Sequence, residues 1–337
     1  MSDRRGPLPV RVVLPWWEDA LHDARESGVE PSLPAMRWLV ARAAQRRPVT
    51  NPWRDWLLAS TGLGEYVGGR FPAGPTVRAA FQAATPQGSW AVAQPVHLAA
   101  AIDHLRLAAL QNLSVSAEES AALLETINRH LAGTGFVLRA NSPELWSLQC
   151  AEPIECNTFE PAQVVGRNVR DYMPAGRDGA AIRGLMNEIQ MLLHEHPVNE
   201  RRTRGGRLSV NSLWMWGFGS LTPPAPKRLP VLATDDAWLT GLWRLHGAQS
   251  LPAAEAAARL ERPIAGALIA LAQPGDRAYE TALCDIDATV LQAARAAVAG
   301  GRCRALEIRT GATVVVMDAR SRWRCWRRPA RIAEARP

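Results

Sequence analysis

Cysteine is scarce in this sequence, and its distribution excludes the common cysteine-based scaffolds. Five cysteines occur among 337 residues, an odd number with no pair at CxxC spacing. A structural zinc site needs ligands at short, regular spacing, and a disulfide framework needs cysteines in even numbers. We therefore expect neither kind of site, and we predict that the cysteines are buried free thiols.

The sequence also lacks a long hydrophobic run. Its most apolar stretch, residues 265–272, is far shorter than the roughly 20 residues that a membrane-spanning helix needs. The apolar stretch near the N-terminus is interrupted by Pro9 and Pro15, which is atypical of a signal peptide. We predict a cytoplasmic protein that does not bind a membrane.

Lysine is almost absent: Lys227 is the only lysine, and arginine supplies the rest of the positive charge. The formal net charge is +7, and residues 301–337 account for all of it with ten arginines against three carboxylates. A basic tail of this kind can recruit nucleic acid or acidic partners. Since arginine replaces lysine throughout the chain, we favour a solvated, charge-rich C-terminus over nucleic-acid binding.

The pattern of apolar residues predicts an α/β fold. Residues 10–14 form a β-branched run that suits a buried parallel strand, and residues 179–196 carry the single apolar stripe of an amphipathic helix. Residues 209–216 have apolar side chains on both faces, which suits a central strand of a covered sheet. The segments 305–308 and 313–317 are predicted to form a hairpin around a Thr-Gly turn.

A second group of elements predicts an inserted domain. Ser116 and Glu119 have the spacing of a capping box that opens a helix, and two short strands follow at residues 136–139 and 145–150. We therefore expect an α+β insert over residues 95–175. The core domain, residues 1–94 and 176–337, is expected to be a doubly wound, mostly parallel sheet.

Three segments resemble a known family. They are residues 173–178, residues 186–199 with the motif HPVN, and residues 210–217 with the motif NSLWMWG. These segments resemble the bacterial family called regulatory protein, RpfE type. Its members are often labelled cofactor-independent phosphoglycerate mutases, within the alkaline phosphatase superfamily. The resemblance is strongest over residues 95–220 and implies the doubly wound fold together with a regulatory role.

The resemblance also implies a two-metal site, which the matching positions do not supply. The family's chemistry needs two divalent cations held by Asp and His side chains, and a Ser or Thr that takes a phosphoryl group. The first strand should end in Asp-Gly, but here it runs into Pro15, and the first carboxylate is Glu18. Residues 305–311 lack the expected Asp-His pair. We therefore predict no metal, no cofactor and no catalytic residue.

Eight side chains remain as candidates for ligand binding. They are Arg167, Arg170, His194, His196, Asn199, Asn211, Trp214 and Trp216. The arginine forks suit phosphate, although loop arginines near aspartates are more often solvated. The two tryptophans end a buried strand, where open α/β sheets bind ligands, yet large rings more often fill a core.

The histidines and asparagines among these candidates have competing structural roles. His194 and His196 stand two residues apart, so on a helix they point about 200° away from each other and cannot share one metal. We favour a role at the helix end for both histidines. For Asn199 and Asn211, a pocket and a bond to loop backbone are equally expected.

Three functions follow from these observations. The first is a non-catalytic phosphoglycerate mutase-like protein with a regulatory or binding role, whose partner is an unidentified protein or a small phosphorylated ligand. The second is a metal-dependent phosphomutase or phosphatase with a relocated metal site, which predicts turnover that EDTA abolishes. The third is nucleic-acid binding through the basic tail at residues 319–337, which predicts steeply salt-dependent affinity.

Overall fold

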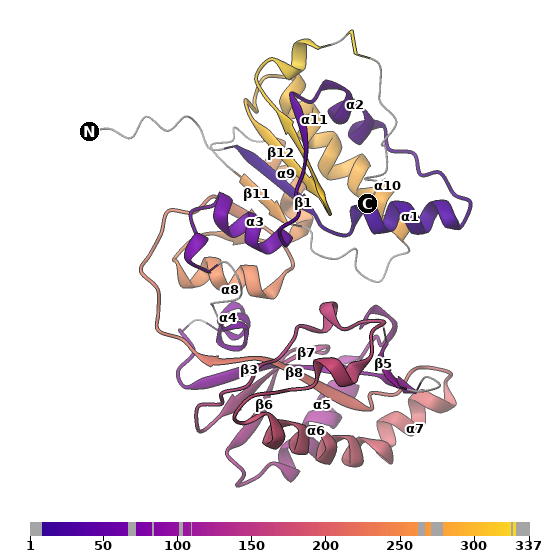
Figure 1. Ribbon diagram of the computed structural model, residues 1–337, viewed down its shortest axis with the longest axis vertical. Helices are drawn as coiled ribbons and strands as arrows, with labels where there is room; N and C mark the ends of the chain where they lie inside the picture. Colours follow the sequence, from indigo (N-terminus) through magenta and orange to yellow (C-terminus); the bar gives the residue numbers. More distant parts are fainter. Residues whose placement is uncertain are drawn as a thin grey trace. The chain divides into compact units, whose positions relative to one another are not determined.

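The chain forms two compact units. The computed structural model describes residues 9–66, 72–82, 84–100, 104–108, 110–261, 267–270, 279–324 and 326–327 (Figure 1). Unit 1 comprises residues 1–70 and 225–337, and unit 2 comprises residues 71–224. The expected boundaries lay after residues 94 and 175. The observed boundaries differ from the expected ones because strands β3 (Ser89–Val96) and β8 (Ser212–Ser220) pair with each other in the sheet of unit 2.

Unit 1 is built on a seven-stranded sheet with the order β10-β9-β11-β1-β12-β13-β2. The strands are β1 (Val10–Leu14), β2 (Gln45–Pro48), β9 (Val231–Ala233), β10 (Ser250–Leu251), β11 (Ala267–Ala270), β12 (Leu306–Thr310) and β13 (Thr313–Met317). The first five in spatial order run parallel, and β13 is antiparallel to both of its neighbours. The predicted α/β class with a mostly parallel sheet is confirmed, as is the hairpin formed by β12 and β13.

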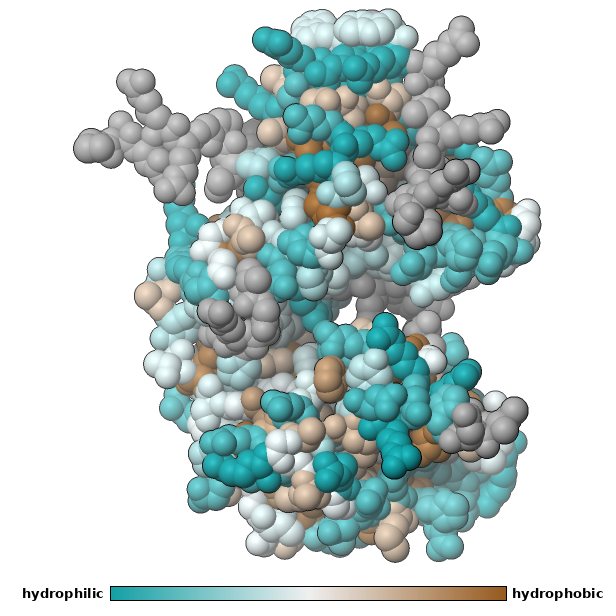
Figure 2. Space-filling model, in the orientation of Figure 1, coloured by the Kyte–Doolittle hydropathy of each residue, from teal (hydrophilic) through white to brown (hydrophobic). Residues whose placement is uncertain are grey.

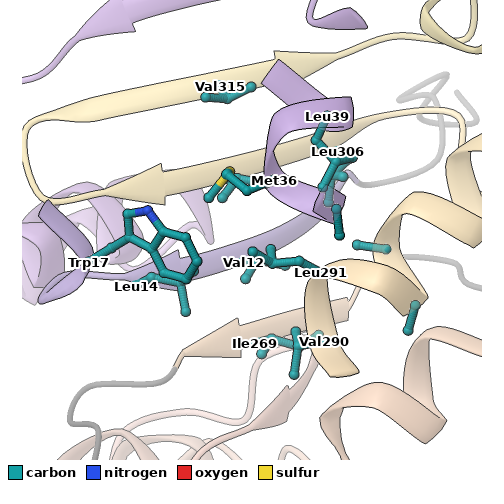
Figure 3. Close-up of a cluster of buried hydrophobic side chains, with 14 of the residues drawn as sticks. Val12, Leu14, Trp17, Met36, Leu39, Ile269, Val290, Leu291, Leu306 and Val315 are labelled. Atoms are coloured by element: carbon teal, nitrogen blue, oxygen red, sulfur yellow. The ribbon is translucent and has the colours of Figure 1, made fainter. Parts of the chain in front are cut away.

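Helices cover both faces of this sheet (Figure 1). They are α1 (Trp17–Glu26), α2 (Pro34–Arg42), α3 (Trp53–Ser60), α8 (Ala237–Leu245), α9 (Ala256–Glu261), α10 (Tyr279–Ile286) and α11 (Gln292–Ala299), with a π-helical segment at Asp287–Leu291. Side chains alternate along β1, so Val12 and Leu14 face the core of Figure 3, where they lie among Met36 and Leu39 of α2. On the opposite face, the Arg309 guanidinium lies 5.6 Å from the ring of Trp56 in α3.

Unit 2 contains a four-stranded antiparallel sheet with the order β6-β7-β3-β8. Its further elements are α4 (Ala73–Ala80), β4 (Leu98–Ala100), β5 (Leu105–Leu107), α5 (Ala117–His130), β6 (Phe136–Ser142), β7 (Leu145–Cys150), α6 (Gly179–His194) and α7 (Pro197–Arg204). Ala91 and Ala93 of β3 pack in one core with α5 and α6. Gly74 of α4 allows close approach on the other face, because a Cβ there would lie 2.3 Å from the Trp90 carbonyl oxygen.

Two expectations for this part of the chain are corrected. The strand over residues 209–216 is not central, because β8 lies at the edge of its sheet and runs antiparallel to β3. Its side chains are buried on both faces because helices and the segment around Phe159 cover the sheet, so burial did not require a second neighbouring strand. The helix predicted over residues 179–196 ends at His194, and Pro197 begins α7.

Two features of the surface and core bear on the sequence expectations. Among the helices that the structure describes, none has the length and apolar character needed to cross a membrane. Cys150 and Cys303 are buried free thiols, as predicted, whereas the free thiols of Cys156 and Cys284 are only partly buried. Cys325 lies outside the described residues. Burial raises the pKa of the Cys150 thiol to about 12, so this cysteine is not a thiolate at neutral pH.

Candidate functional site

The carboxyl ends of the parallel strands in unit 1 gather a group of polar side chains. Open α/β sheets bind their ligands at this edge, which makes it the natural place to look for a site. The group consists of Glu18, Asn51, Arg54, Asp235, Asp236, Arg309 and Thr310. These side chains come from the end of β12 and from the segments that follow β1, β2 and β9, so only the folded sheet brings them together.

Glu18 is the carboxylate nearest to the end of β1. Its Oε1 atom accepts a hydrogen bond from the Thr310 hydroxyl (2.9 Å), and its Oε2 atom accepts one from the Ala312 amide (3.1 Å). A Cβ at Gly311 would lie 2.8 Å from Oε2, so glycine is required where the hairpin turn passes the carboxylate. Glu18 therefore holds the turn between β12 and β13 against the start of α1.

Two further carboxylates follow β9, and each binds its own chain. Asp236 caps α8, because its Oδ1 atom accepts a hydrogen bond from the Leu239 amide (2.8 Å). Its Oδ2 atom lies 2.8 Å from Arg54 Nη2, in an ion pair in which the Asp236 side chain is only 7% exposed. Asp235 accepts a hydrogen bond from the Ala253 amide (3.0 Å).

Arg309 brings a buried guanidinium to the same edge. The residue is 2% exposed, and its Nη2 atom donates to the Asn51 carbonyl oxygen (2.5 Å). Its Nε atom has no hydrogen-bond partner among the described residues. Burial lowers the pKa of Arg309, and the nearby Glu18 carboxylate opposes that change. The edge thus holds two arginines, one paired with Asp236 and one with Asn51.

In unit 2, the predicted histidines do not converge. His196 begins α7, where its Nδ1 atom accepts a hydrogen bond from the Val198 amide (3.2 Å). Because Nδ1 is an acceptor, we assign the proton to Nε2, which lies 3.0 Å from the Thr126 hydroxyl. Burial lowers the pKa of His196. His194 is exposed, so only His196 has a structural role of the kind favoured from the sequence.

Acidification is expected to weaken unit 2 through His196. In the unfolded chain, the His196 imidazole becomes protonated near pH 6.5, whereas burial lowers its pKa in the folded chain. The contribution of His196 to stability is therefore complete above pH 6.5, and it is lost as the pH falls through the lower folded pKa. Hydrogen exchange of α7 between pH 7.5 and pH 5 measures this loss. His196→Gln should reduce the dependence, and His194→Gln should leave it intact. Equal pH dependence in all three proteins would contradict the assignment.

The two predicted asparagines act as backbone bridges. Asn199 donates to the carbonyl oxygens of Leu193 and Val210, both at 2.7 Å, and accepts from the Val210 amide at 2.8 Å. Asn211 accepts from the Leu98 amide (2.7 Å) and donates to the Leu98 carbonyl oxygen (2.9 Å). Both side chains tie the start of β8 to neighbouring segments.

The predicted tryptophans also make contacts within unit 2. Trp214 is 1% exposed, and its Nε1 atom donates to the Phe159 carbonyl oxygen (2.8 Å). Trp216 is partly buried and donates to the Gln94 side chain (3.0 Å). These hydrogen bonds satisfy the indole groups inside the fold, as buried tryptophans require.

The predicted arginines lie in one exposed loop. Arg167 donates to the Tyr172 hydroxyl (2.8 Å), and Arg170 is exposed. Bridges from β5 to Val165 and Asn168 hold this loop in place. Within the described part of the chain, no hydrogen bond links the two arginines to the other six candidates. Among the described residues, the two arginines therefore do not form one hydrogen-bonded site with the other six candidates.

Comparison with known proteins finds similarity over part of the chain. A 2,3-bisphosphoglycerate-independent phosphoglycerate mutase from Methanosarcina barkeri is 30% identical over 131 residues, which cover 38% of this chain and 32% of that protein. The enzyme of the same name from Methanothrix thermoacetophila is 29% identical over 112 residues, or 33% of this chain and 27% of that protein. Over these segments, the chain is similar to the cofactor-independent phosphoglycerate mutases. It matches about a third of the length of these curated relatives.

One solved structure supports the fold of this chain. The PH0037 protein from Pyrococcus horikoshii aligns over 92% of this chain and 86% of its own, with a TM-score of 0.54 and 13% identity. A cofactor-independent phosphoglycerate mutase from Thermoplasma acidophilum aligns over 91% of this chain and 88% of its own, with a TM-score of 0.42 and 14% identity. No protein-family model matches the chain.

The side chains at the carboxyl edge of this mutase-like chain do not fit a two-metal centre. Such a centre needs several carboxylate or imidazole ligands that converge on shared ions. In the described ranges, no group of three or more His, Cys, Asp or Glu side chains is placed to hold a metal ion. Glu18, Asp235 and Asp236 instead bind three different backbone amides. We therefore derive no reaction step through a metal.

Sequence reasoning missed the arginines of this edge. Arg54 and its partner Asp236 are 182 positions apart, and Arg309 and Asn51 are 258 positions apart. Spacing along the chain gives no sign of such pairs. The only available signal was the Asp235-Asp236 pair directly after the short apolar run 231–233, at a position where parallel strands place functional residues.

Proposed function

We propose that this mutase-like chain has a regulatory or binding role and does not carry out metal-dependent phosphoryl transfer. The proposal rests on the carboxyl edge of the sheet in unit 1, where the carboxylates of Glu18 and Asp236 hold the chain's own turn and helix. The finer assignment to the RpfE-type regulatory family is part of the proposal and rests on the HPVN and NSLWMWG motifs. We place its action in the cytoplasm, with an unidentified protein or a small phosphorylated ligand as partner.

The chemistry of the edge supports this role. Phosphoryl transfer requires a nucleophile in line with the phosphorus and positive charge at the transferring oxygens. The guanidinium of Arg54 is paired with Asp236, and that of Arg309 is directed at Asn51. Thr310 is hydrogen-bonded to Glu18 as an activated hydroxyl would be, but it is only 6% exposed and so is shielded from a substrate.

We expect no mutase or phosphatase turnover from the purified chain. The assay uses 3-phosphoglycerate and p-nitrophenyl phosphate with manganese, magnesium or zinc, and EDTA provides the background rate. Rates equal to the EDTA control are the expected result, because the edge carboxylates are committed to backbone amides. Two matched variants make the assay decisive: Glu18→Gln at the edge, and Asp23→Asn on the exposed side of α1.

EDTA-sensitive turnover that disappears in Glu18→Gln and persists in Asp23→Asn would establish the alternative, a phosphomutase or phosphatase with a relocated metal site.

The same preparation tests the ligand part of the proposal. A small phosphorylated ligand held by Arg167 and Arg170 should raise the melting temperature of the native chain and not that of Arg170→Ala. Arg177→Ala is the control, because Arg177 is already paired with Glu155 and Asp178.

A further inference from the structure

Unit 1 carries a second polar region at the other end of its parallel strands. Exposed arginines and tryptophans gather there from β2, from the loop before β12, and from the segment after β13. We call them the basic aromatic surface: Arg46, Arg47, Arg302, Arg304, Arg320, Arg322, Trp323 and Trp326. In Figure 2, hydrophilic residues gather at the top of unit 1, where Figure 1 shows the yellow C-terminal part of the chain.

The sheet register places these segments together. Leu306 at the start of β12 pairs with Met317 at the end of β13, and Val316 pairs with Gln45 at the start of β2. The beginning of β2, the beginning of β12 and the end of β13 therefore share one end of the sheet. The candidate functional site lies at the opposite end, beyond the carboxyl ends of β1 and β12.

Side-chain contacts hold the C-terminal segment against this end. Arg324 and Arg327 donate to the carbonyl oxygens of Arg42 and Ala43, each at 3.0 Å, directly before β2. Ser321 is fully buried and bonds to Asp318 (2.9 Å). The tryptophans that follow are thus displayed on a fixed segment, with Trp323 62% exposed and Trp326 72% exposed.

The positive charge of the surface is largely uncompensated. At this end of the sheet, two carboxylates of the described residues are paired with arginines: Glu307 with Arg11 (2.8 Å) and Asp318 with Arg324 (3.1 Å). Arg47 reaches Glu307 only at 3.9 Å. Among the described residues, the other arginines of the surface have no carboxylate within 4.0 Å. They are Arg46, Arg302, Arg304, Arg320 and Arg322.

We propose that the basic aromatic surface binds single-stranded nucleic acid. Exposed indole rings provide stacking platforms for unpaired bases, and guanidinium forks bind the phosphates between them. The Arg322 guanidinium lies over the Trp323 ring, 4.5 Å from its centroid, so a positive charge is held against one face of this exposed ring. Duplex DNA hides its base faces inside the stack, so it can use only the arginines.

The geometry favours this partner over an anionic membrane. Membrane-surface segments insert a continuous apolar face of an amphipathic helix. Here Trp323 ends a three-residue 3₁₀ turn, Ser321–Trp323, and Trp326 comes three residues later, with arginines at positions 322, 324 and 327. The surface therefore offers stacking sites separated by charge and no continuous apolar face.

The test measures binding of fluorescent oligothymidylate of about 20 nucleotides to the full chain by anisotropy, beside a duplex of the same length. We expect tighter binding to the single strand, with an affinity that falls steeply with salt. Trp323→Ala with Trp326→Ala should weaken single-strand binding about tenfold or more and leave duplex binding unchanged. Arg302→Gln with Arg304→Gln should weaken both and reduce the salt dependence.

The control is Arg129→Gln with Arg201→Gln, which removes the same charge from exposed positions of unit 2 and should leave the affinity unchanged. No binding by the native chain, or equal losses in the control and the tryptophan variant, would overturn the proposal. Binding to phosphatidylglycerol vesicles that needs both tryptophans, without oligothymidylate binding, would replace it with a membrane role. Point substitutions are preferable to deleting residues 319–337, because deletion also removes buried Ser321 and the contacts of Arg324.

Discussion

Replacing Arg202 with leucine is expected to lower the free energy of unfolding of unit 2 by about 3–5 kcal/mol. Arg202 belongs to α7 and is fully buried. Its guanidinium donates to the carbonyl oxygens of Leu208 (2.7 Å), Ser114 (3.2 Å) and Leu113, and it forms an ion pair with Glu119. Leucine fills part of the volume but leaves these buried acceptors without a donor, which is the main reason for the loss.

The matched control is Arg207→Leu. Arg207 binds the same carboxylate at 2.6 Å, but its side chain is 50% exposed, so water replaces it and the expected loss is under about 1 kcal/mol. Because the chain has two compact units and hydrogen exchange reports on each element separately, exchange of α5 and α7 is the appropriate measurement. Similar exchange in the two variants would show that the buried network does not determine the stability of unit 2.

Local features of the fold were predictable because neighbouring residues create them. Ser116 and Glu119 indicated a capping box, and both of its hydrogen bonds are present. The Thr-Gly turn indicated the hairpin of β12 and β13, which pair from Leu306 to Thr310. In each case, a few residues close in sequence determine the structure.

The rest of the fold and of the candidate site depends on pairs far apart in sequence. Apolar side chains on both faces of residues 209–216 correctly indicated burial, but burial does not reveal which sheet a strand joins. The domain boundaries expected from the sequence differ from the two units for the same reason. The side-chain pairs of the carboxyl edge could not be predicted from the sequence. The whole of unit 2 lies between Arg54 and Asp236 in the sequence, although the two side chains form an ion pair in unit 1.

Replacing Asp287 with alanine is expected to destabilise unit 1 by about 3 kcal/mol. Asp287 is 1% exposed and lies in the π-helical segment between α10 and α11. Its two oxygens accept hydrogen bonds from the amides of Ala35 (2.9 Å) and Met36 (2.7 Å), the first turn of α2. No side chain of α2 caps its own N-terminus, so Asp287 supplies the acceptors for two of the amides at this helix start.

Without that carboxylate, the two amides are left buried and unpaired, and the contact between α2 and the π-helical segment is weakened. Hydrogen exchange of residues 34–42 measures the effect directly, because α2 should lose protection before the rest of unit 1. Asp287→Asn should be intermediate, since the amide keeps one acceptor. The control is Glu280→Gln, at an exposed position of α10, which should not change the exchange of α2.

The pH dependence of unit 1 provides an independent measurement of the same group. Burial raises the pKa of Asp287 above 3.8, and the two backbone hydrogen bonds oppose that change. The folded chain therefore holds this proton more tightly than the unfolded chain does. Its contribution to stability is largest below pH 3.8 and declines as the pH rises through the folded pKa. Asp287→Asn should abolish this decline, and an unchanged pH profile would show that Asp287 titrates as it does in the unfolded chain.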